Sequence, residues 1–265
     1  MDAVHAHLRA FLGAVAGLPG GELAEDGGVL WCRTPIAWPM FNGVIASPSL
    51  GRCDGIGRAL DALMAHGMPW FAWVLPDTPA EVMEAVVRAG ATEFEIRAPW
   101  MEARIADLEE PELPPGVTVE EVRDEPGVRR WAAARGEIYG TSGAAEQAWA
   151  MPGRLVGWDR QPWRQWLAYA DGAPAAVTMT YCGGGIAGLF GVGTKRELRG
   201  RGLGRLITLL PLKASGGEIA GLFATAAGER LYAHLGFEHR GWVSRWLGGP
   251  PAPDALARAR GATGR

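Results

Sequence analysis

The stretch "VGTKRELRGRGLGRLITLL", residues 192–210, decides the predicted fold of this protein. A short apolar segment leads into glycines set between arginines, and a leucine-rich helical pattern follows immediately. Glycine lets the backbone adopt left-handed angles and approach a ligand closely. The first N–H groups of a helix have no internal partner, and the helix dipole adds partial positive charge there. The stretch therefore predicts a strand, a turn that binds a phosphate or pyrophosphate group, and a helix.

The spacing of these glycines excludes two common phosphate-binding motifs. It does not match the Gly-x-x-x-x-Gly-Lys-Ser/Thr pattern of a P-loop. The order Gly200-x-Gly202-x-Gly204 also departs from the Gly-x-Gly-x-x-Gly pattern of dinucleotide-binding folds. An Arg-Gly tract that binds RNA is a further alternative, but such tracts are usually longer and disordered. Because this one leads into a helix, we favour a small phosphate-bearing ligand.

Composition and charge narrow the class of protein. The chain has 265 residues, 48% of them hydrophobic and 21% charged, which is enough for a packed core in one large or two small domains. A net charge of −3 argues against a protein that coats nucleic acid or an anionic membrane. The three cysteines are far apart, so neither a disulfide framework nor a zinc site is indicated. We expect a cytoplasmic protein with no metal, nucleic-acid or membrane partner.

The chain divides at a break rich in proline and glutamate, residues 107–116. This segment has little apolar surface to bury and cannot hold a helix past its prolines, so it predicts a linker. The second half alternates strands and helices. Strands are expected at 117–122, on both sides of the Asp171-Gly172 turn, and at 185–194, 218–225 and 239–247. Helices are expected at 124–140, 203–213 and 226–237, with Pro211 ending or bending the second of these.

Two motifs of this half resemble the GNAT superfamily of acyl-CoA N-acetyltransferases. The family pattern Arg/Gln-x-x-Gly-x-Gly/Ala is met by Arg199, Gly202 and Gly204, after an apolar strand that ends in "GVGT". The "YAHLGF" segment at 232–237 supplies the family's second hallmark. The resemblance covers roughly residues 117–247 and implies an α/β (α+β) fold, with a mixed, mostly antiparallel sheet flanked by helices. It also implies acetyl-CoA as cosubstrate and a small-molecule or peptide amine as acceptor.

The resemblance assigns roles to particular residues. The backbone of the glycine-rich turn would bind the CoA pyrophosphate, and the ends of the two neighbouring strands would bind the pantetheine arm and the thioester. The cofactor-binding residues implied in this way are Val192, Gly193, Thr194, Arg199, Gly200, Arg201, Gly202, Leu203, Gly204, Arg205 and Thr225. Tyr232 would protonate the departing thiolate, and a phenol with a pKa near 10 suits that task. The alternative for Tyr232 is an aromatic side chain of the core.

The general base for the acceptor amine is less well defined. The amine must lose a proton before it attacks, so a carboxylate or a chain of waters is expected. Glu137 is our catalytic candidate, with Glu146 and Glu229 as alternatives, and each could equally be a solvated surface charge. Several tryptophans either frame the acceptor or simply fill the core: Trp149, Trp158, Trp163 and Trp166.

The first half of the sequence repeats the order of strands and helices expected in the second half. Residues 68–105 read as strand, helix, glycine stop and strand, and aligning Gly90 with Gly236 superimposes the two late helices. This indicates a duplicated architecture, the alternative being two unrelated α/β halves. Val86 then stands where Tyr232 stands, and the loop before the matching earlier helix keeps only two closely spaced glycines. We therefore expect this half to be a degenerate GNAT-like domain with a structural role.

These inferences give one interpretation of the whole chain. A degenerate GNAT-like domain is expected over 1–106, a linker over 107–116, a catalytic GNAT domain over 117–247 and a flexible tail over 248–265. The expected activity is direct transfer of an acetyl group from acetyl-CoA to an amine in a ternary complex. A non-catalytic acyl-CoA-binding protein and a transferase of longer acyl chains are the alternatives. Acceptor identity is open, and so is whether the protein forms a homodimer.

Overall fold

The computed structural model describes residues 2–46, 52–140 and 143–250. The chain forms two compact units. Unit 1 comprises Met1–Pro99 together with a C-terminal stretch that begins at Gly241, and unit 2 comprises Trp100–Arg240. The predicted tail lies outside the described residues from position 251 onward.

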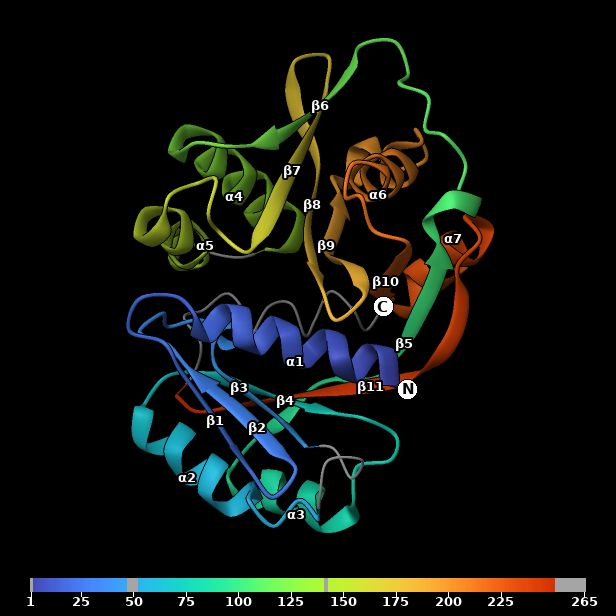
Figure 1. Ribbon diagram of the computed structural model, residues 1–265. Coiled ribbons are helices and arrows are strands. Elements are labelled where there is room, and N and C mark those ends of the chain that lie inside the picture. The colour runs from blue at the N-terminus through green and yellow to red at the C-terminus, as the bar shows by residue number, and fades with distance from the viewer. Residues whose placement is uncertain (1, 47–51, 141–142, 251–265) are drawn as a thin grey trace. The chain divides into compact units, whose positions relative to one another are not determined.

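Unit 1 is a sheet with helices on both faces (Figure 1). Its strands follow the order β1-β2-β3-β4-β11, and only the β3–β4 pair among them is parallel. The elements that build it are α1 (Asp2–Ala16), β1 (Glu22–Asp26), β2 (Val29–Arg33), β3 (Gly43–Ala46), α2 (Ile56–His66), β4 (Trp70–Val74), α3 (Ala80–Arg88) and the first part of β5 (Thr92–Arg104).

The helices of unit 1 cover the sheet with regularly spaced apolar side chains. The buried stripe of α1 consists of Val4, Leu8, Phe11, Leu12 and Val15, which is the spacing of one helical face. On the opposite face of the sheet, α2 and α3 place Leu60, Leu63, Val82 and Val86 in one core cluster with side chains of β2, β3 and β4. The helix α3 spans the same positions as α7 when Gly90 is aligned with Gly236.

Unit 2 contains a larger sheet in the order β5-β10-β9-β8-β7-β6, in which only the β9–β10 pair is parallel. Its elements are β6 (Val117–Val122), α4 (Glu125–Tyr139), α5 (Gly143–Val156), β7 (Trp163–Ala170), β8 (Ala173–Gly183), β9 (Ile186–Thr194), α6 (Leu203–Lys213), β10 (Ile219–Phe223), α7 (Ala226–His234) and β11 (Glu238–Gly248), of which only the first residues belong to this unit.

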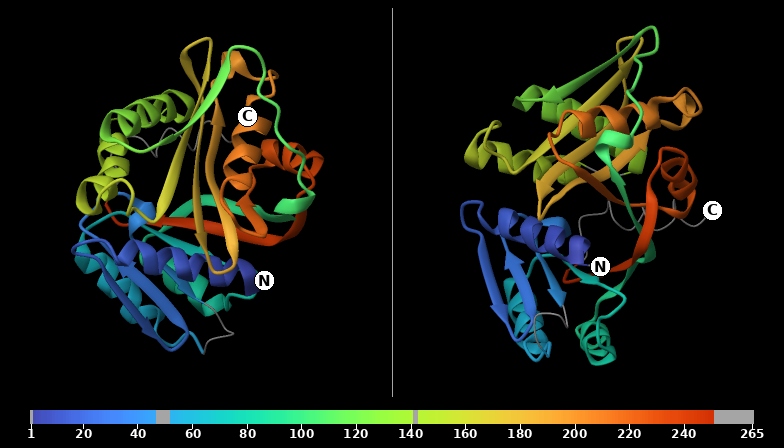
Figure 2. Two further views of the ribbon diagram at one scale, coloured as in Figure 1. Left: turned by 45° about the horizontal axis from the view of Figure 1, so that its top comes forward. Right: turned by 45° about the vertical axis from the view of Figure 1, so that its right-hand side comes forward.

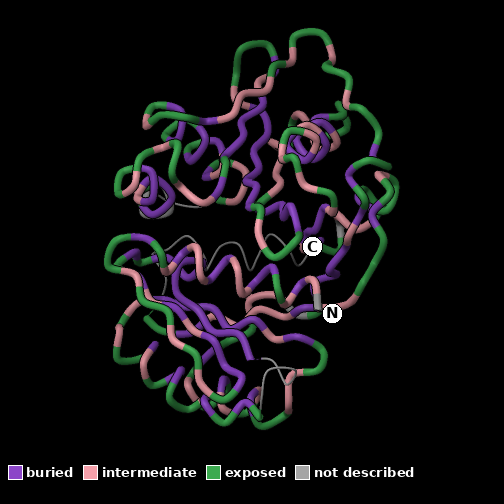
Figure 3. The backbone as a smooth tube through the Cα atoms, viewed as in Figure 1, coloured by how far each residue is buried: buried purple, intermediate pink, exposed green. Residues whose placement is uncertain are grey.

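Two helical layers enclose the sheet of unit 2. The helices α4 and α5 lie on one face of β7–β9, and α6 lies on the other (Figures 1 and 2). Between them β8 and β9 are largely buried (Figure 3). The predicted hairpin turn between β7 and β8 is confirmed, with Asp171 at φ 52° and Gly172 at φ 80°. Two successive left-handed residues match the tight turn that the twist of a hairpin favours.

Each unit completes its sheet with a strand from the other half of the sequence. The end of β5, Trp100–Arg104, pairs with β10 in unit 2, although β5 follows α3 of unit 1. Reciprocally, residues 244–248 of β11 pair with β4 in unit 1, although β11 follows α7 of unit 2. The predicted domain ranges, 1–106 and 117–247, therefore differ from the compact units. Sequence rhythm shows where a strand lies but not which distant strand it pairs with.

Two further points concern the helices. Pro211 does not end α6, which continues to Lys213 because the Ala214 N–H still bonds to the Leu210 carbonyl oxygen at 3.0 Å. Proline removes only its own bond to the carbonyl four residues earlier, here that of Ile207, so the residues after it can still continue the helix. Among the described residues, every helix is too short or too polar to cross a lipid bilayer.

Candidate functional site

The strands β9 and β10 of unit 2 separate at their carboxyl ends. Their parallel pairing begins at Ile186 and Ile219 and ends at Leu189 and Leu222. The strand β9 nevertheless continues to Thr194. The last residues of β9 thus have no strand partner on the β10 side within the described sheet, and their backbone groups on that edge can bind an extended ligand.

A β-bulge interrupts β9 where the strands separate. The β8–β9 ladder shifts register there, and Gly191 has a φ of 62°, a left-handed angle that glycine adopts without strain. The hydroxyl of Tyr139, from α4, donates a 2.8 Å hydrogen bond to the carbonyl oxygen of Val192. A Cβ atom at Gly193 would lie 2.7 Å from Ile138 Cγ2, so this position requires glycine. The bulge brings the end of α4 directly against the backbone of β9.

The predicted glycine-rich turn is present at the start of α6. Gly200 and Gly202 both have a φ of 80°, and Gly202 is the N-cap of α6. A Cβ atom at either position would meet no described atom within 4 Å, so side chains do not fill the turn. The side chain of Leu203 is buried in the core beneath α6, which leaves only its backbone N–H to bind a ligand. The first N–H groups of α6 have no partner within the helix, and the Cβ positions of Gly200 and Gly202 beside them are open, which suits an anion site.

The arginines of this turn carry exposed positive charge. Arg201 forms a 3.7 Å ion pair with Asp171, and Arg205 forms an ion pair with Glu109. The side chains of all four residues are 42–75% exposed. Exposed pairs of this kind contribute little to stability, so both guanidinium groups can exchange their partners for a phosphate at small cost.

The end of β9, the start of α6 and α7 meet at one place. A Cβ atom at Gly204 would lie 3.7 Å from Thr194 Oγ1 and 3.5 Å from the side chain of Leu231. Arg199 also reaches β9, because its Nε donates a 3.4 Å hydrogen bond to the Thr194 carbonyl oxygen. The predicted residues at the end of β9 and in the turn are therefore neighbours in unit 2.

Tyr232 lies in the core next to the separated strands. It is 7% exposed and shares a cluster with Leu189 and Leu222, where the ladder ends. Burial raises the pKa of the Tyr232 phenol above its ordinary value, and the nearby Tyr139 raises it further. Gly228 makes room for the ring, because a Cβ atom there would lie 3.0 Å from Tyr232 Cε2. A neutral phenol in this place is a hydrogen-bond donor, which fits both the catalytic and the core interpretation.

Thr225 caps a helix. Its hydroxyl oxygen accepts a 3.1 Å hydrogen bond from the Gly228 N–H at the start of α7. The hydroxyl group can still donate one hydrogen bond, so a contact with a cofactor stays a prediction alongside the cap. The sequence places Thr225 at the end of a strand, whereas β10 ends at Phe223.

The three candidate bases differ in their surroundings. Glu137 forms a 2.5 Å ion pair with Lys195, the residue that follows β9, and its side chain is 63% exposed. Glu229 lies in the first turn of α7. The side chain of Glu146 lies outside the described part of the chain. Of the two whose side chains are described, Glu137 contacts the segment after the bulge, and its role as base stays a prediction.

The sequence did not single out Arg135, which lies beside the bulge. Its guanidinium group lies 6.0 Å from the ring centre of Trp131, 5.1 Å from that of Tyr139 and 5.3 Å from that of Trp149. Its Nη1 atom is buried and has no hydrogen-bond partner. A Cβ atom at Gly191 would lie 3.8 Å from Arg135 Nε. The only sequence signal was the helical spacing of Trp131, Arg135 and Tyr139 along one face.

The tryptophans are divided between the two faces of the sheet. Trp149 stacks edge-to-face against Trp131 at 5.7 Å and against Trp163 at 6.5 Å, under α4 and α5. Trp166 is buried on the other face, with side chains of α6. The four predicted tryptophans therefore do not frame one site, and Trp149 alone also borders Arg135.

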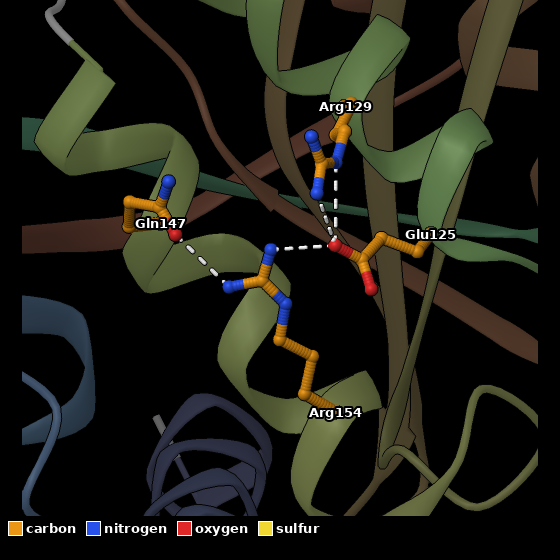
Figure 4. A network of polar contacts seen from close by, with 4 residues as sticks. All are labelled: Glu125, Arg129, Gln147 and Arg154. Carbon is orange, nitrogen blue, oxygen red and sulfur yellow. Dashed lines mark hydrogen bonds and ion pairs between the residues drawn. The ribbon is translucent and has the colours of Figure 1, made fainter.

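A polar network joins α4 and α5, which cover one face of the sheet of unit 2 (Figure 4). The Glu125 carboxylate, at the start of α4, accepts hydrogen bonds from Arg129 at 2.6 Å and from Arg154 of α5 at 2.7 Å. Arg154 also donates to Gln147 at 2.9 Å. The hydrogen bonds from Arg154 and Arg129 lower the pKa of Glu125 to about 2. The hydrogen bond from Arg154 to Glu125 ties α5, which contains Trp149, to the start of α4.

Comparison with known proteins identifies the fold. No protein-family profile matches the sequence, and no curated protein sequence matches it. Among solved structures, a GCN5-related N-acetyltransferase from Kribbella flavida is 21% identical with a TM-score of 0.67, over 96% of this chain and 98% of that one. A tandem GNAT protein from the clavulanic acid biosynthesis pathway is 17% identical with a TM-score of 0.56, over 89% of this chain and 86% of that one.

A third structure agrees. A GCN5-related N-acetyltransferase from Sphaerobacter thermophilus is 14% identical with a TM-score of 0.57, over 96% of this chain and 95% of that one. Because these matches span nearly the whole chain, both units take part in the similarity. The chain has the fold of the GNAT N-acetyltransferases, in a tandem arrangement of two α/β units, which confirms the predicted fold class.

Proposed function

We propose that this GNAT-fold chain is an acetyl-CoA-dependent N-acetyltransferase whose active site lies in unit 2. The observation that carries the proposal is the combination of an open, glycine-rich helix start with a bulged strand that separates from its neighbour. The first feature suits a pyrophosphate, and the second suits an extended arm that ends in a thioester. Arg199, Gly202 and Gly204 match the family pattern at this helix start.

The proposed binding mode uses backbone groups for most contacts. The N–H groups of residues 200–205 would hold the pyrophosphate of acetyl-CoA, with Arg201 and Arg205 adding charge. The free edge of β9, residues 190–194, would pair with the pantetheine arm. The acetyl group would then lie at the bulge, near Val192. Catalysis in such a site comes mainly from positioning of the two reactants.

The proposed reaction is direct transfer. The acceptor amine, after losing a proton, attacks the thioester carbonyl carbon, so that a C–N bond forms and the C–S bond breaks. A backbone N–H at the bulge would stabilise the negative oxygen of the intermediate. Tyr232 would give its phenolic proton to the departing CoA thiolate. Glu137 would take the first proton of the amine directly or through water, and its ion pair with Lys195 holds its carboxylate beside the end of β9. The second proton, which the nitrogen loses as the C–S bond breaks and the amide forms, would return the Tyr232 phenolate to a phenol through water.

Calorimetric titration with acetyl-CoA, followed by a thiol-release assay over a panel of amines, tests the proposal. We expect one acetyl-CoA bound per chain and release of free CoA with at least one class of amine. Failure to bind acetyl-CoA at millimolar concentration would overturn the proposal. Binding without thiol release from any amine would favour a non-catalytic acyl-CoA-binding protein. Titrations with propionyl- and succinyl-CoA measure the preference for acyl length.

A further inference from the structure

We propose that Arg135 binds a carboxylate group, so that the acceptor is an amine that also carries a carboxylate. The inference rests on the proposed function, because it places this carboxylate next to the bulge where transfer would occur. It assigns a specificity role to a residue that none of the sequence motifs includes.

The first argument is that Arg135 has no acidic partner within the described residues. The other arginines of α4 all have one: Arg129 pairs with Glu125, and Arg130 pairs with Glu120. Arg135 instead lies among aromatic rings, and its Nη1 atom is buried without a hydrogen bond. A guanidinium group in such a place loses hydration that the rings replace only in part. A bound carboxylate would restore the missing hydrogen bonds.

The second argument is the shape of the group. A guanidinium presents its N–H donors in a flat fork that matches the two oxygens of a carboxylate. Here the central carbon of the group lies 5.1 Å from the ring centre of Tyr139 and 5.3 Å from that of Trp149. A ring face attracts the positive charge but does not pair with the in-plane N–H donors, which a planar ligand can do. The arrangement therefore favours a carboxylate.

The third argument is the position of Arg135 relative to the bulge. Its Nε would lie 3.8 Å from a Cβ atom at Gly191, and the adjoining Tyr139 hydroxyl bonds to the Val192 carbonyl oxygen. Arg135 belongs to α4, on the face of the sheet opposite α6 (Figure 1). The pyrophosphate site at the start of α6 leaves the α4–α5 face for the acceptor. A carboxylate on Arg135 would therefore hold the amine of a small acceptor within reach of the thioester.

The experiment compares acids with their neutral counterparts in the thiol-release assay. L-amino acids and the corresponding amino amides are the acceptors, and the protein is the full chain with acetyl-CoA. The variants are Arg135→Gln and Arg135→Lys, with Arg129→Gln as the matched control on the same helix. Melting temperature and acetyl-CoA affinity are measured for each variant, so that a misfolded protein is recognised. Should Arg135→Gln misfold, Arg135→Lys carries the test.

We expect the wild-type protein to prefer the acids. Arg135→Gln should lower kcat/KM for the acids about 10- to 100-fold, the range for loss of a charged hydrogen bond, chiefly through KM. The same variant should change kcat/KM for the amides less than about threefold. Arg135→Lys should keep part of the preference, because it keeps the charge but not the fork. Arg129→Gln should leave kcat/KM unchanged for both the acids and the amides.

A second arm distinguishes the two sources of a carboxylate. Succinyl-CoA with a neutral amine presents the acid on the acyl group, and a preference for it that depends on Arg135 would assign the site to the acyl donor. Three results in the acceptor assay speak against the carboxylate role: acids and amides react equally, no acid reacts, or both Arg135 variants keep the wild-type preferences. Any one of them overturns it when succinyl-CoA also gives no higher kcat/KM than acetyl-CoA. Failure of the wild-type protein to bind acetyl-CoA would instead overturn the proposed function.

Discussion

The two units contain the same strand–helix–strand segment, but the start of its helix is crowded in unit 1 and open in unit 2. In unit 1, a Cβ atom at Gly55, the N-cap of α2, would lie 2.2 Å from the Asp26 carbonyl oxygen. The turn between β1 and β2 packs there. In unit 2, a Cβ atom at Gly202, the N-cap of α6, would meet no described atom within 4 Å. Among the described residues, the N-cap position of this helix is therefore crowded in unit 1 and open in unit 2.

The units also differ in the charge at the helix start and in the helices α3 and α7. Asp26 places a carboxylate near the start of α2, where it pairs with Arg58, and a negative group there opposes a phosphate. Val86 of α3 is buried in the core of unit 1, whereas its counterpart in α7 is Tyr232. A duplicated fold can thus keep its architecture in both copies and its ligand chemistry in one. Residues 47–51, within the loop before α2, lie outside the described part of the chain.

Closing the open helix start should have the largest effect. Gly202→Val puts a branched side chain at a left-handed φ and into the mouth of α6. We expect acetyl-CoA affinity to fall by about 100-fold or more, since two charged hydrogen bonds are lost. Gly57→Ala, at an equally open position in α2, is the control and should bind normally. Calorimetry measures both, and undiminished binding by Gly202→Val would mean that the cofactor site lies elsewhere, unit 1 included.

Removing the phenol that unit 1 lacks should have the next largest effect. Tyr232→Phe should lower kcat in the thiol-release assay by about 100-fold, with acetyl-CoA affinity unchanged. Burial raises the Tyr232 pKa above its ordinary value, so the phenol stays protonated up to a pH of about 10. Ionisation of Tyr232 should therefore cause no loss of the wild-type rate in that pH range. Tyr169→Phe, which removes a hydroxyl bonded to Glu120, is the control. Equal turnover by Tyr232→Phe would assign Tyr232 to the core alone.

Crowding the closed helix start should affect stability and not binding. Gly55→Ala adds a Cβ atom that cannot fit without a shift of the backbone at Asp26. The φ of Gly55 is −75°, so alanine is not strained by the angle itself. We expect a loss of about 1–3 kcal/mol in the free energy of unfolding, measured in urea. A parallel loss of acetyl-CoA affinity would contradict the assignment of the cofactor site to unit 2 alone.

The smallest effect concerns the Glu125 network, which lies on the acceptor face and not at the helix start. The hydrogen bonds from Arg154 and Arg129 hold the folded-state pKa of Glu125 at about 2, below its ordinary value of 4.5. Its contribution is therefore present above a pH near 4.5 and is lost as the pH falls through about 2. Glu125→Gln should lower the melting temperature slightly at pH 7, and the difference from wild type should shrink by pH 3. Acetyl-CoA affinity should not change, and a large loss would link the two regions.

The sequence predicted local features well where short-range chemistry decides them. The helix that starts at Leu203 and the turn at Asp171 follow from glycine and turn residues close by in the chain. It predicted less well where a residue's partner is distant. The pairing of β5 with β10 and of β11 with β4 was not predicted, because these strands lie far apart in the sequence. The isolated charge of Arg135 could not be read from its neighbours in sequence, because only packing shows which carboxylates are out of reach.

By itself the sequence predicted most strands and helices of the second half, the family resemblance and a phosphate-binding site at residues 199–205. These depend on backbone preferences and spacing, which act over a few residues. The tertiary structure decided which strands complete each sheet, which of two similar helix starts remains open, and that Arg135 has no acidic partner among the described residues. Each of these depends on segments that are far apart in the chain and meet only on folding.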